Sequence, residues 1–345
     1  YIEPDFVIHI NLLYFIIKFN YMKDKRYLSY SKNNIQPLSV KLIRGRNVES
    51  VHRVHAVVTD SKARIIFHAG DFDYLTFIRS SLKPFQAIPF VSSGASEKIK
   101  TGNKGLAISS ASHSGSTMHG REVFKLLWNS QIDINYLKTP KPKWAISPLQ
   151  HNCSGKHASM LATCKKMNWP LESYLSQSHP IQKEIKRKLA ELLNTSTEKL
   201  ELERDDCGCP TFLLHLSQMA LLYAHLGNSQ NAELEQISRA MLLFPELVAG
   251  EGFFDTELMK RSHGQILSKG GAEGIQCISR IGEGLGLAIK VEDGSKRAKH
   301  ASALHILRQL EWLTPVRLDE LEEKINTLPI GQRIEVEGKL SFVEP

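Results

Sequence analysis

The sequence predicts an α/β (α+β) protein, in which a sheet built from N- and C-terminal strands is flanked by helices and carries a helical lobe. Two observations predict this fold. Runs rich in β-branched and apolar residues occur near the start of the chain and again in its last third. Between them, apolar residues recur at the three- and four-residue spacing of a helix face. We expect one domain at residues 36–345, with the helical lobe at about 117–245.

The predicted elements follow in order. Residues 54–60 and 63–69 are β-rich and are separated only by Ser61 and Lys62, which predicts a hairpin. Pro180 and Gly227 stand where a helix is expected to start and to end. The predicted helices of the middle are 118–128, 156–168, 181–194 and 212–226. Three β-rich segments, 264–269, 275–281 and 285–292, precede a long predicted helix at 295–313.

The composition excludes several classes of protein. The chain has 345 residues, 42% of them hydrophobic, and a net charge of +8, which fits a folded protein with a buried core. Its Lys and Arg residues are spread along the chain and are seldom next to aromatic residues, so we expect no nucleic-acid partner. Five scattered cysteines do not make a disulfide framework. A reducing compartment, and hence a cytoplasmic location, is expected.

Residues 1–35 are interpreted as an N-terminal extension. The segment 6–21 is apolar but short for a membrane span and contains His9, Asn11 and Lys18. It lacks the basic start and the small-residue cleavage site of a signal peptide. We interpret residues 1–21 as lying upstream of a translation start at Met22, with a signal anchor as the alternative. No stable membrane partner is expected.

A candidate nucleophile lies at Ser80, three residues before Lys83. If a helix starts near Ser80, the two side chains lie on one face of it. A desolvated lysine can take the proton of a serine hydroxyl, and the helix N-terminus favours the negative charge that develops. The same S-x-x-K spacing, followed by a Lys-Thr-Gly strand, marks serine β-lactamases and penicillin-binding proteins. Lys269, followed by two glycines, resembles that second part.

The spacing alone does not identify the site, because it occurs at Ser29/Lys32, Ser80/Lys83 and Ser196/Lys199. Context favours Ser80, which follows the strand-rich region and precedes an apolar run. An ordinary helix start with an exposed lysine is the alternative interpretation.

Two further stretches carry chemically active groups. Residues 108–115 (ISSASHSG) surround His113 with small and hydroxyl-bearing residues. Ser112 is there a candidate second nucleophile or proton relay, and a helix N-cap loop is the alternative. Cys153 and Lys156 precede a predicted helix, and Cys207 lies about fifty residues further on. Such residues can share a zinc ion, although standard spacings such as C-x-x-C are absent, so buried thiols that act as small apolar groups remain an alternative.

Together these stretches resemble the asparaginase II family of bacterial proteins, the Rhizobium type. The resemblance runs from about residue 48 to residue 313. Its motifs are VESVHRVHAVV, RSSLKPFQAIPFVSSGA, ASHSG, HNCSGKHASMLA, WPLESYL, HPIQ, DDCGCPTF, FPELVAGEGFFDTELM, SKGGAEG and GLGLAIKVEDGSKRA.

The resemblance implies an amidohydrolase that converts L-asparagine to L-aspartate and ammonia, and a homodimer. It implies a fold similar to that of serine β-lactamases and glutaminases. The implied site residues are two Ser–Lys tandems, Ser80 with Lys83 and Ser112 with Lys269, supported by Arg79, His113 and Asp205. The implied zinc ligands are Cys153, Lys156 and Cys207.

Three positions depart from the family pattern. Asp206 stands where Gly is usual, Cys209 where a small residue is usual, and Ser116 where an acidic residue is common. Asp206 adds a carboxylate near the expected metal, and Cys209 is a rival ligand. The change at Ser116 bears on substrate preference.

We expect Lys83 to take the proton of Ser80 as Ser80, rather than Ser112, attacks the side-chain amide first. A β-lactamase or D-alanyl peptidase is an alternative, although its Ser-Asp-Asn element is absent from the chain. A homologue that has lost turnover is another alternative, because a fold does not by itself give a function.

Overall fold

The structure is a computed structural model that describes residues 35–228, 230–325 and 327–343. The elements below belong to one compact unit, Gln36–Pro345. The expectations for residues 1–34, including the apolar segment 6–21, lie outside the described residues. Among the helices described, none is both long enough and apolar enough to cross a membrane.

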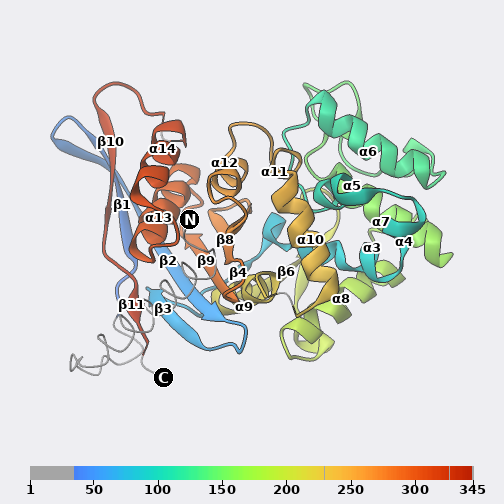
Figure 1. The fold of residues 1–345 in the computed structure, drawn as a ribbon, viewed down its shortest axis with the longest axis horizontal. Helices are drawn as coiled ribbons and strands as arrows, with labels where there is room; N and C mark the ends of the chain where they lie inside the picture. Colours follow the sequence, from blue (N-terminus) through green and yellow to red (C-terminus); the bar gives the residue numbers. More distant parts are fainter. Residues whose placement is uncertain (1–34, 229, 326, 344–345) are drawn as a thin grey trace, which may run out of the picture. The chain divides into compact units, whose positions relative to one another are not determined.

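The central sheet draws its strands from both ends of the chain, as predicted (Figure 1). Its main path runs β10-β1-β2-β9-β8-β7, and β3 pairs with both β2 and β11. All of the neighbouring strands are antiparallel. The strands are β1 Leu38–Arg44, β2 Asn47–Asp60, β3 Ile65–Ala69, β7 Ile266–Gly270, β8 Ile275–Arg280, β9 Leu285–Val291, β10 Gln332–Glu337 and β11 Ser341–Phe342.

The predicted hairpin is confirmed as β2 and β3, and the three later strands are confirmed as β7, β8 and β9. The sequence interpretation missed β1, β10 and β11. In β10 charged residues alternate with apolar ones, and every residue is at least partly exposed. In β1 polar residues stand between apolar ones and leave no long apolar run, whereas most of β9 is apolar and buried.

Helices cover both faces of the sheet. On one face α9 (Leu216–Leu226) packs against β2, β8 and β9, and on the other α13 (Lys296–Gln309) packs against β1, β2 and β9. The side chain of Ala288 therefore joins a different apolar cluster from those of Leu287 and Ile289. Gly286 permits the close approach of α9, because a Cβ there would lie 2.0 Å from the carbonyl oxygen of Ala220.

The predicted helix at 212–226 is wrong in its first part. Residues Pro210–His215 form the strand β6, which pairs with β4 (Leu75–Phe77) and β5 (Leu202–Arg204), and α9 starts only at Leu216. An apolar run allows either structure, and pairing with two distant strands decided in favour of the strand. The Gln218 side chain accepts the backbone N–H of His215 at 3.0 Å and so marks the true helix start.

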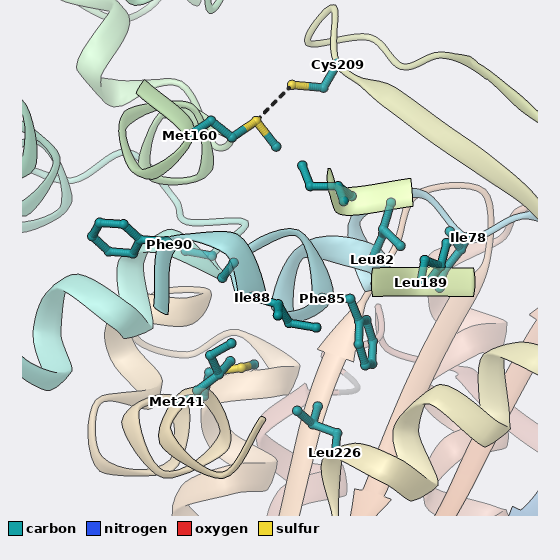
Figure 2. Packing of buried hydrophobic residues seen from close by; sticks show 14 of the residues in the cluster. Ile78, Leu82, Phe85, Ile88, Phe90, Met160, Leu189, Cys209, Leu226 and Met241 are labelled. Atoms are coloured by element: carbon teal, nitrogen blue, oxygen red, sulfur yellow. Dashed lines mark hydrogen bonds between the residues drawn. The ribbon is translucent and has the colours of Figure 1, made fainter. Parts of the chain in front are cut away.

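The middle of the chain is mainly helical. The predictions at 118–128, 156–168, 181–194 and 295–313 are confirmed to within a few residues as α6, α7, α8 and α13. Figure 2 shows the apolar core of this region, where Leu82, Phe85 and Ile88 are buried near Met241. Apart from α9 and α13, the α-helices described are α2 Lys83–Gln86, α3 Ile88–Ser92, α4 Ala95–Lys98, α5 Gly102–Ser109, α6 Thr117–Asn129, α7 Ser154–Met167, α8 Pro180–Leu192, α10 Ala232–Leu243, α11 Pro245–Val248, α12 Phe254–Arg261 and α14 Pro315–Ile325.

Candidate active site

Ser80 lies in a short 3-10 helix, η1 (Arg79–Leu82), that leads directly into α2. The helix start predicted at Ser80 is thus confirmed to within one residue. Ser80 is half-buried, whereas Lys83 is only 1% exposed. The neighbouring Ser81 fixes this turn, because its hydroxyl donates to the Lys269 carbonyl at 2.9 Å and its carbonyl accepts the Tyr223 hydroxyl at 2.8 Å. The turn is therefore tied to both β7 and α9.

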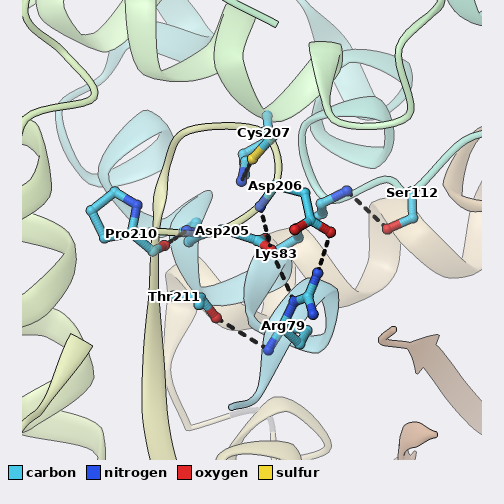
Figure 3. A network of polar contacts seen from close by, with 10 residues as sticks. Arg79, Lys83, Ser112, Asp205, Asp206, Cys207, Pro210 and Thr211 are labelled. Carbon is cyan, nitrogen blue, oxygen red and sulfur yellow. Dashed lines mark hydrogen bonds and ion pairs between the residues drawn. The ribbon is translucent and has the colours of Figure 1, made fainter. Parts of the chain in front are cut away.

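Arg79, directly before Ser80, has a backbone φ of +52°. This left-handed conformation is costly for a residue with a Cβ, and such strain gathers at functional sites. The Arg79 backbone N–H donates to Thr211 Oγ1 at 3.2 Å. Its guanidinium donates to Asp205 at 2.9 Å and to Asp206 at 2.5 Å (Figure 3). Two of the three predicted support residues, Arg79 and Asp205, are therefore in direct contact.

Ser112 lies between the two predicted lysines. Lys83 Nζ and Lys269 Nζ each lie 2.8 Å from Ser112 Oγ (Figure 3 shows the first of these contacts). The backbone N–H of Ser112 donates to the Val248 carbonyl at 2.8 Å, which fixes the loop after α5. The fold thus joins three of the four predicted catalytic residues into one hydrogen-bonded chain.

The contacts of Lys83 differ from the simplest sequence expectation. Its amine donates to Ser112 Oγ, to the Ala111 carbonyl at 2.7 Å and to the Asn152 carbonyl at 3.3 Å. Among the described residues, Lys83 thus has these three hydrogen-bond acceptors, and Ser80 is not one of them. Catalytic hydrogen bonds often tighten only when substrate binds. The pairing of Lys83 with Ser80 therefore stays a prediction that rests on their three-residue spacing.

Lys269 lies in β7 and is fully buried. Burial lowers the pKa of its amine to about 7, helped by the charges of Lys83 and Lys299 and opposed by the carboxylate of Asp255. Its amine also donates to the Gly270 carbonyl at 2.8 Å. An amine with this pKa exchanges protons readily at neutral pH, which suits a general base or a relay.

Sequence reasoning missed Asp255, the buried counter-charge of Lys269. One carboxylate oxygen accepts hydrogen bonds from Ser268 Oγ at 2.7 Å and from Gln276 Nε2 at 2.8 Å, and the other accepts the Gly270 N–H at 2.8 Å. Burial alone would raise the pKa of Asp255, but the charge of Lys269 and these hydrogen bonds lower it overall. Asp255 belongs to the motif FFDTELM, where no local pattern separates it from its acidic neighbours.

His113 is 2% exposed and supports the Ser112 loop. Its Nδ1 accepts the Gly115 N–H at 3.1 Å, so Nε2 carries the proton and donates to Ser154 Oγ at 2.9 Å. Burial lowers the pKa of His113 well below its usual range. Both ring nitrogens of the neutral His113 imidazole are therefore engaged in hydrogen bonds within the protein, which fits the predicted support role better than a contact with substrate.

The three expected zinc ligands lie together. Cys153, Lys156 and Cys207 are 5%, 2% and 2% exposed, and Lys156 Nζ lies 3.2 Å from Cys207 Sγ. Hydrogen bonds from the Cys153 and Cys209 thiols, together with the charge of Lys156, lower the pKa of Cys207. Two thiols and an amine in a dry pocket fit a borderline-soft metal, once the amine has lost its proton. Asp206 does not join them, because its side chain is 90% exposed and pairs with Arg79.

A sequence model of the L-asparaginase II family matches residues 40–342. Among curated proteins none matches. Structures of Mglu are similar, one at 10% identity with a TM-score of 0.47, covering 75% of this chain and 67% of that one. Another, in its tris and glutamate form, has 12% identity and a TM-score of 0.46, with 75% and 59% covered. The chain thus spans 59% to 67% of these Mglu chains.

A beta-lactamase from Mycobacterium bovis is similar at 11% identity, with a TM-score of 0.40, over 85% of this chain and 96% of that one.

Proposed function

The chain belongs to the L-asparaginase II family, and we propose from this premise that it hydrolyses the side-chain amide of L-asparagine to L-aspartate and ammonia. Family membership supports an amidohydrolase. The observation that supports a specific mechanism is that Ser112 Oγ lies 2.8 Å from the buried amines of both Lys83 and Lys269. This arrangement supports a path along which a proton moves between two lysines.

The proposed relay prepares Lys83 as a base. When Lys269 is neutral, it accepts the Ser112 hydroxyl proton while Ser112 accepts a proton from Lys83. The net result moves one proton from Lys83 to Lys269 and leaves the Lys83 amine neutral. The lowered pKa of Lys269, about 7, leaves a substantial share of its amines neutral at neutral pH and so available to accept that proton.

Neutral Lys83 then accepts the Ser80 hydroxyl proton as Ser80 Oγ bonds to the amide carbon and the carbonyl electron pair moves to oxygen. Backbone N–H groups at the helix start stabilise that oxyanion. The C–N bond breaks, and the leaving nitrogen takes the proton that returns from Lys269 through Ser112. Water hydrolyses the resulting ester, releasing aspartate and restoring Ser80.

Ser80 is proposed as the nucleophile for two reasons. It is half-buried rather than enclosed, and it directly follows the strained, anchored backbone of Arg79. The alternative assigns the attack to Ser112, which already contacts two amines. In that case Ser80 would serve as a binding group.

A metal at the cysteine cluster, if the chain binds one, supplies positive charge that helps to orient the charged ends of an amino-acid substrate. We further propose a homodimer, which the family resemblance supports, and a cytoplasmic location, which the scattered cysteines support. Sedimentation velocity of the full chain tests the dimer, and a single species at the monomer mass would contradict it.

The experiment that tests the function is ammonia release from L-asparagine, with L-glutamine and a β-lactam as competing substrates. Lys269→Met is compared with Lys260→Met, a matched lysine on the exposed side of α12 that pairs with Glu251. Turnover of asparagine that is lost in the first variant and kept in the second supports the proposal. Folded wild-type protein without activity toward either amide would contradict it.

A further inference from the structure

A groove of about 560 Å³ lies between α9, α10, α11 and α12, and none of the catalytic residues proposed above lines it. Its volume is within the range of about 300–1,000 Å³ that small-molecule sites occupy. Much of its wall is apolar, with Leu226, Leu242, Met259 and Ile281 among the lining residues. We propose that this groove binds a primary ammonium group carried on an apolar chain or ring.

Glu246, in α11, places a negative charge at the groove that has no counter-charge. Its side chain is partly exposed and lines the groove. Among the described residues, no donor lies within hydrogen-bond distance of its carboxylate and no basic group lies within ion-pair distance. His263, exposed at the rim of the same groove, offers a ring nitrogen that can accept a hydrogen bond. Both groups suit a ligand that donates hydrogen bonds and carries positive charge.

The basic side chains of the groove are already paired. Arg239 Nε lies 3.4 Å from Glu235 Oε1. Lys260 Nζ donates to both carboxylate oxygens of Glu251 at 2.8 Å. Neither cation is therefore left to attract an anionic ligand, and the unpaired charge at the groove is that of the α11 carboxylate.

Three helices also end at the groove. Its lining includes Leu226 and Gly227 at the end of α9, Leu243 at the end of α10, and Gly264 shortly after α12. The C-terminal end of a helix carries a partial negative charge, because its last carbonyl groups have no donor within the helix. The three helix ends thus add to the charge of Glu246 and favour a cation over an anion.

The apolar wall determines what the cation carries. Leu243 is 55% exposed, and Leu242 and Ile281 are partly exposed. A phenyl ring or an alkyl chain attached to the ammonium group would remove this apolar surface from water, which is favourable. A bare ammonium ion would leave the wall exposed and would bind through its charge alone.

The short helix α11 connects the groove to the loop that carries Ser112, and it packs against both α10 and α12 (Figure 1). The Glu246 carbonyl accepts the Nε2–H of His119 at 2.8 Å. The Val248 carbonyl accepts the backbone N–H of Ser112 at 2.8 Å. A ligand bound to the Glu246 carboxylate would therefore hold α11 in place, and with it the hydrogen bond that fixes Ser112.

Isothermal titration calorimetry of the full chain with 2-phenylethylamine tests the proposal. The comparison ligand is 3-phenylpropanoate, which has the same ring and ethylene chain but a carboxylate in place of the ammonium group. We expect saturable binding of one amine per chain, and binding of the carboxylate that is weaker by about tenfold or more. Equal affinities would mean that charge does not select the ligand and would overturn the proposal. Absence of amine binding at millimolar concentration would overturn it as well.

The variant Glu246→Gln keeps the shape of the side chain and removes its charge. We expect it to bind the amine about 10- to 100-fold more weakly, because a charge-assisted hydrogen bond is lost. Glu233→Gln is the matched control, since Glu233 lies in α10, pairs with Lys188 at 3.7 Å and does not line the groove. Wild-type affinity in Glu246→Gln would place the amine elsewhere and overturn the assignment. If that variant does not fold, the comparison of amine with carboxylate on the wild type still decides.

Hydrogen exchange followed by mass spectrometry tests the link from the groove to the serine loop. With the groove saturated by 2-phenylethylamine, exchange in the peptide that contains Ser112 should be slower in the wild type and unchanged in Glu246→Gln. Unchanged exchange in the saturated wild type would overturn the link through α11. None of these measurements uses turnover, so their failure is distinct from a failure of the proposed amide hydrolysis.

Discussion

The amine of Lys269 lies 2.8 Å from the hydroxyl of Ser112, in a position that solvent does not reach. In chain order the two residues are 157 positions apart, so only the fold brings them together. An enclosed amine loses its hydration and favours its neutral form. This relationship determines how the proposed activity should depend on pH.

The pH profile is the first prediction. Because Lys269 has a pKa of about 7 and must be neutral to accept the relayed proton, kcat/KM should fall about tenfold per pH unit below that value and level off above it. Initial rates of ammonia release between pH 5 and 9 measure this. A profile that is flat through neutrality would remove Lys269 from the relay.

The second prediction concerns the pH profile and the stability of the Asp255→Asn variant. The Asp255 carboxylate raises the pKa of Lys269, so its loss should move the acidic limb of the profile to lower pH. The variant should also lose about 1–3 kcal/mol of stability, because the Gly270 N–H loses its acceptor. The pH profile and urea unfolding measure the two effects.

Glu257→Gln is the matched control for Asp255→Asn. Glu257 is also buried in α12, but it pairs with Arg261 and Lys324 rather than with the serine site. Glu257→Gln should lower the stability of the protein without moving the acidic limb of its pH profile. If Glu257→Gln and Asp255→Asn shift this limb equally, Asp255 does not affect the pH profile through Lys269.

The two serines give the third prediction. Ser80→Ala should abolish formation of the acyl-enzyme, whereas Ser112→Ala should slow turnover about 10²- to 10⁴-fold, as loss of a proton relay does. Acid quenching followed by peptide mass spectrometry locates the aspartyl ester. An ester on the peptide that contains Ser112 would transfer the nucleophile assignment to that residue.

Local patterns predicted five strands of the sheet and the four longest helices described, because burial on a sheet or a helix face repeats every two or three to four residues. The turn at Ser80 followed from its sequence context. The contact between Lys83 and Ser112 did not, because nothing local encodes a meeting of residues 29 positions apart. Ser112 and Lys269 entered the candidate site mainly through resemblance to a family. That these residues catalyse a reaction stays a prediction.

Asp255 shows a different limit of sequence reasoning. Carboxylates are common near the starts of helices. The sequence around Asp255 therefore does not reveal that its hydrogen-bond partners, Ser268 and Gln276, come from β7 and β8. The buried contact between His157 Nδ1 and the Tyr174 hydroxyl joins residues 17 positions apart, which no local pattern encodes. Buried polar networks depend on side chains that converge from several elements.

The last prediction concerns the strain at Arg79. Its φ of +52° costs a residue with a Cβ about 1–2 kcal/mol, whereas glycine adopts it freely. Arg79→Gly and Arg79→Ala both lose the ion pairs with Asp205 and Asp206. The glycine variant should therefore be more stable than the alanine variant by about 1–2 kcal/mol in urea unfolding. Both should lose activity, because the turn before Ser80 is no longer anchored to the 205–206 loop. If the two variants unfold at the same urea concentration, the left-handed backbone of Arg79 stores no strain, and its part in positioning Ser80 rests on the ion pairs alone.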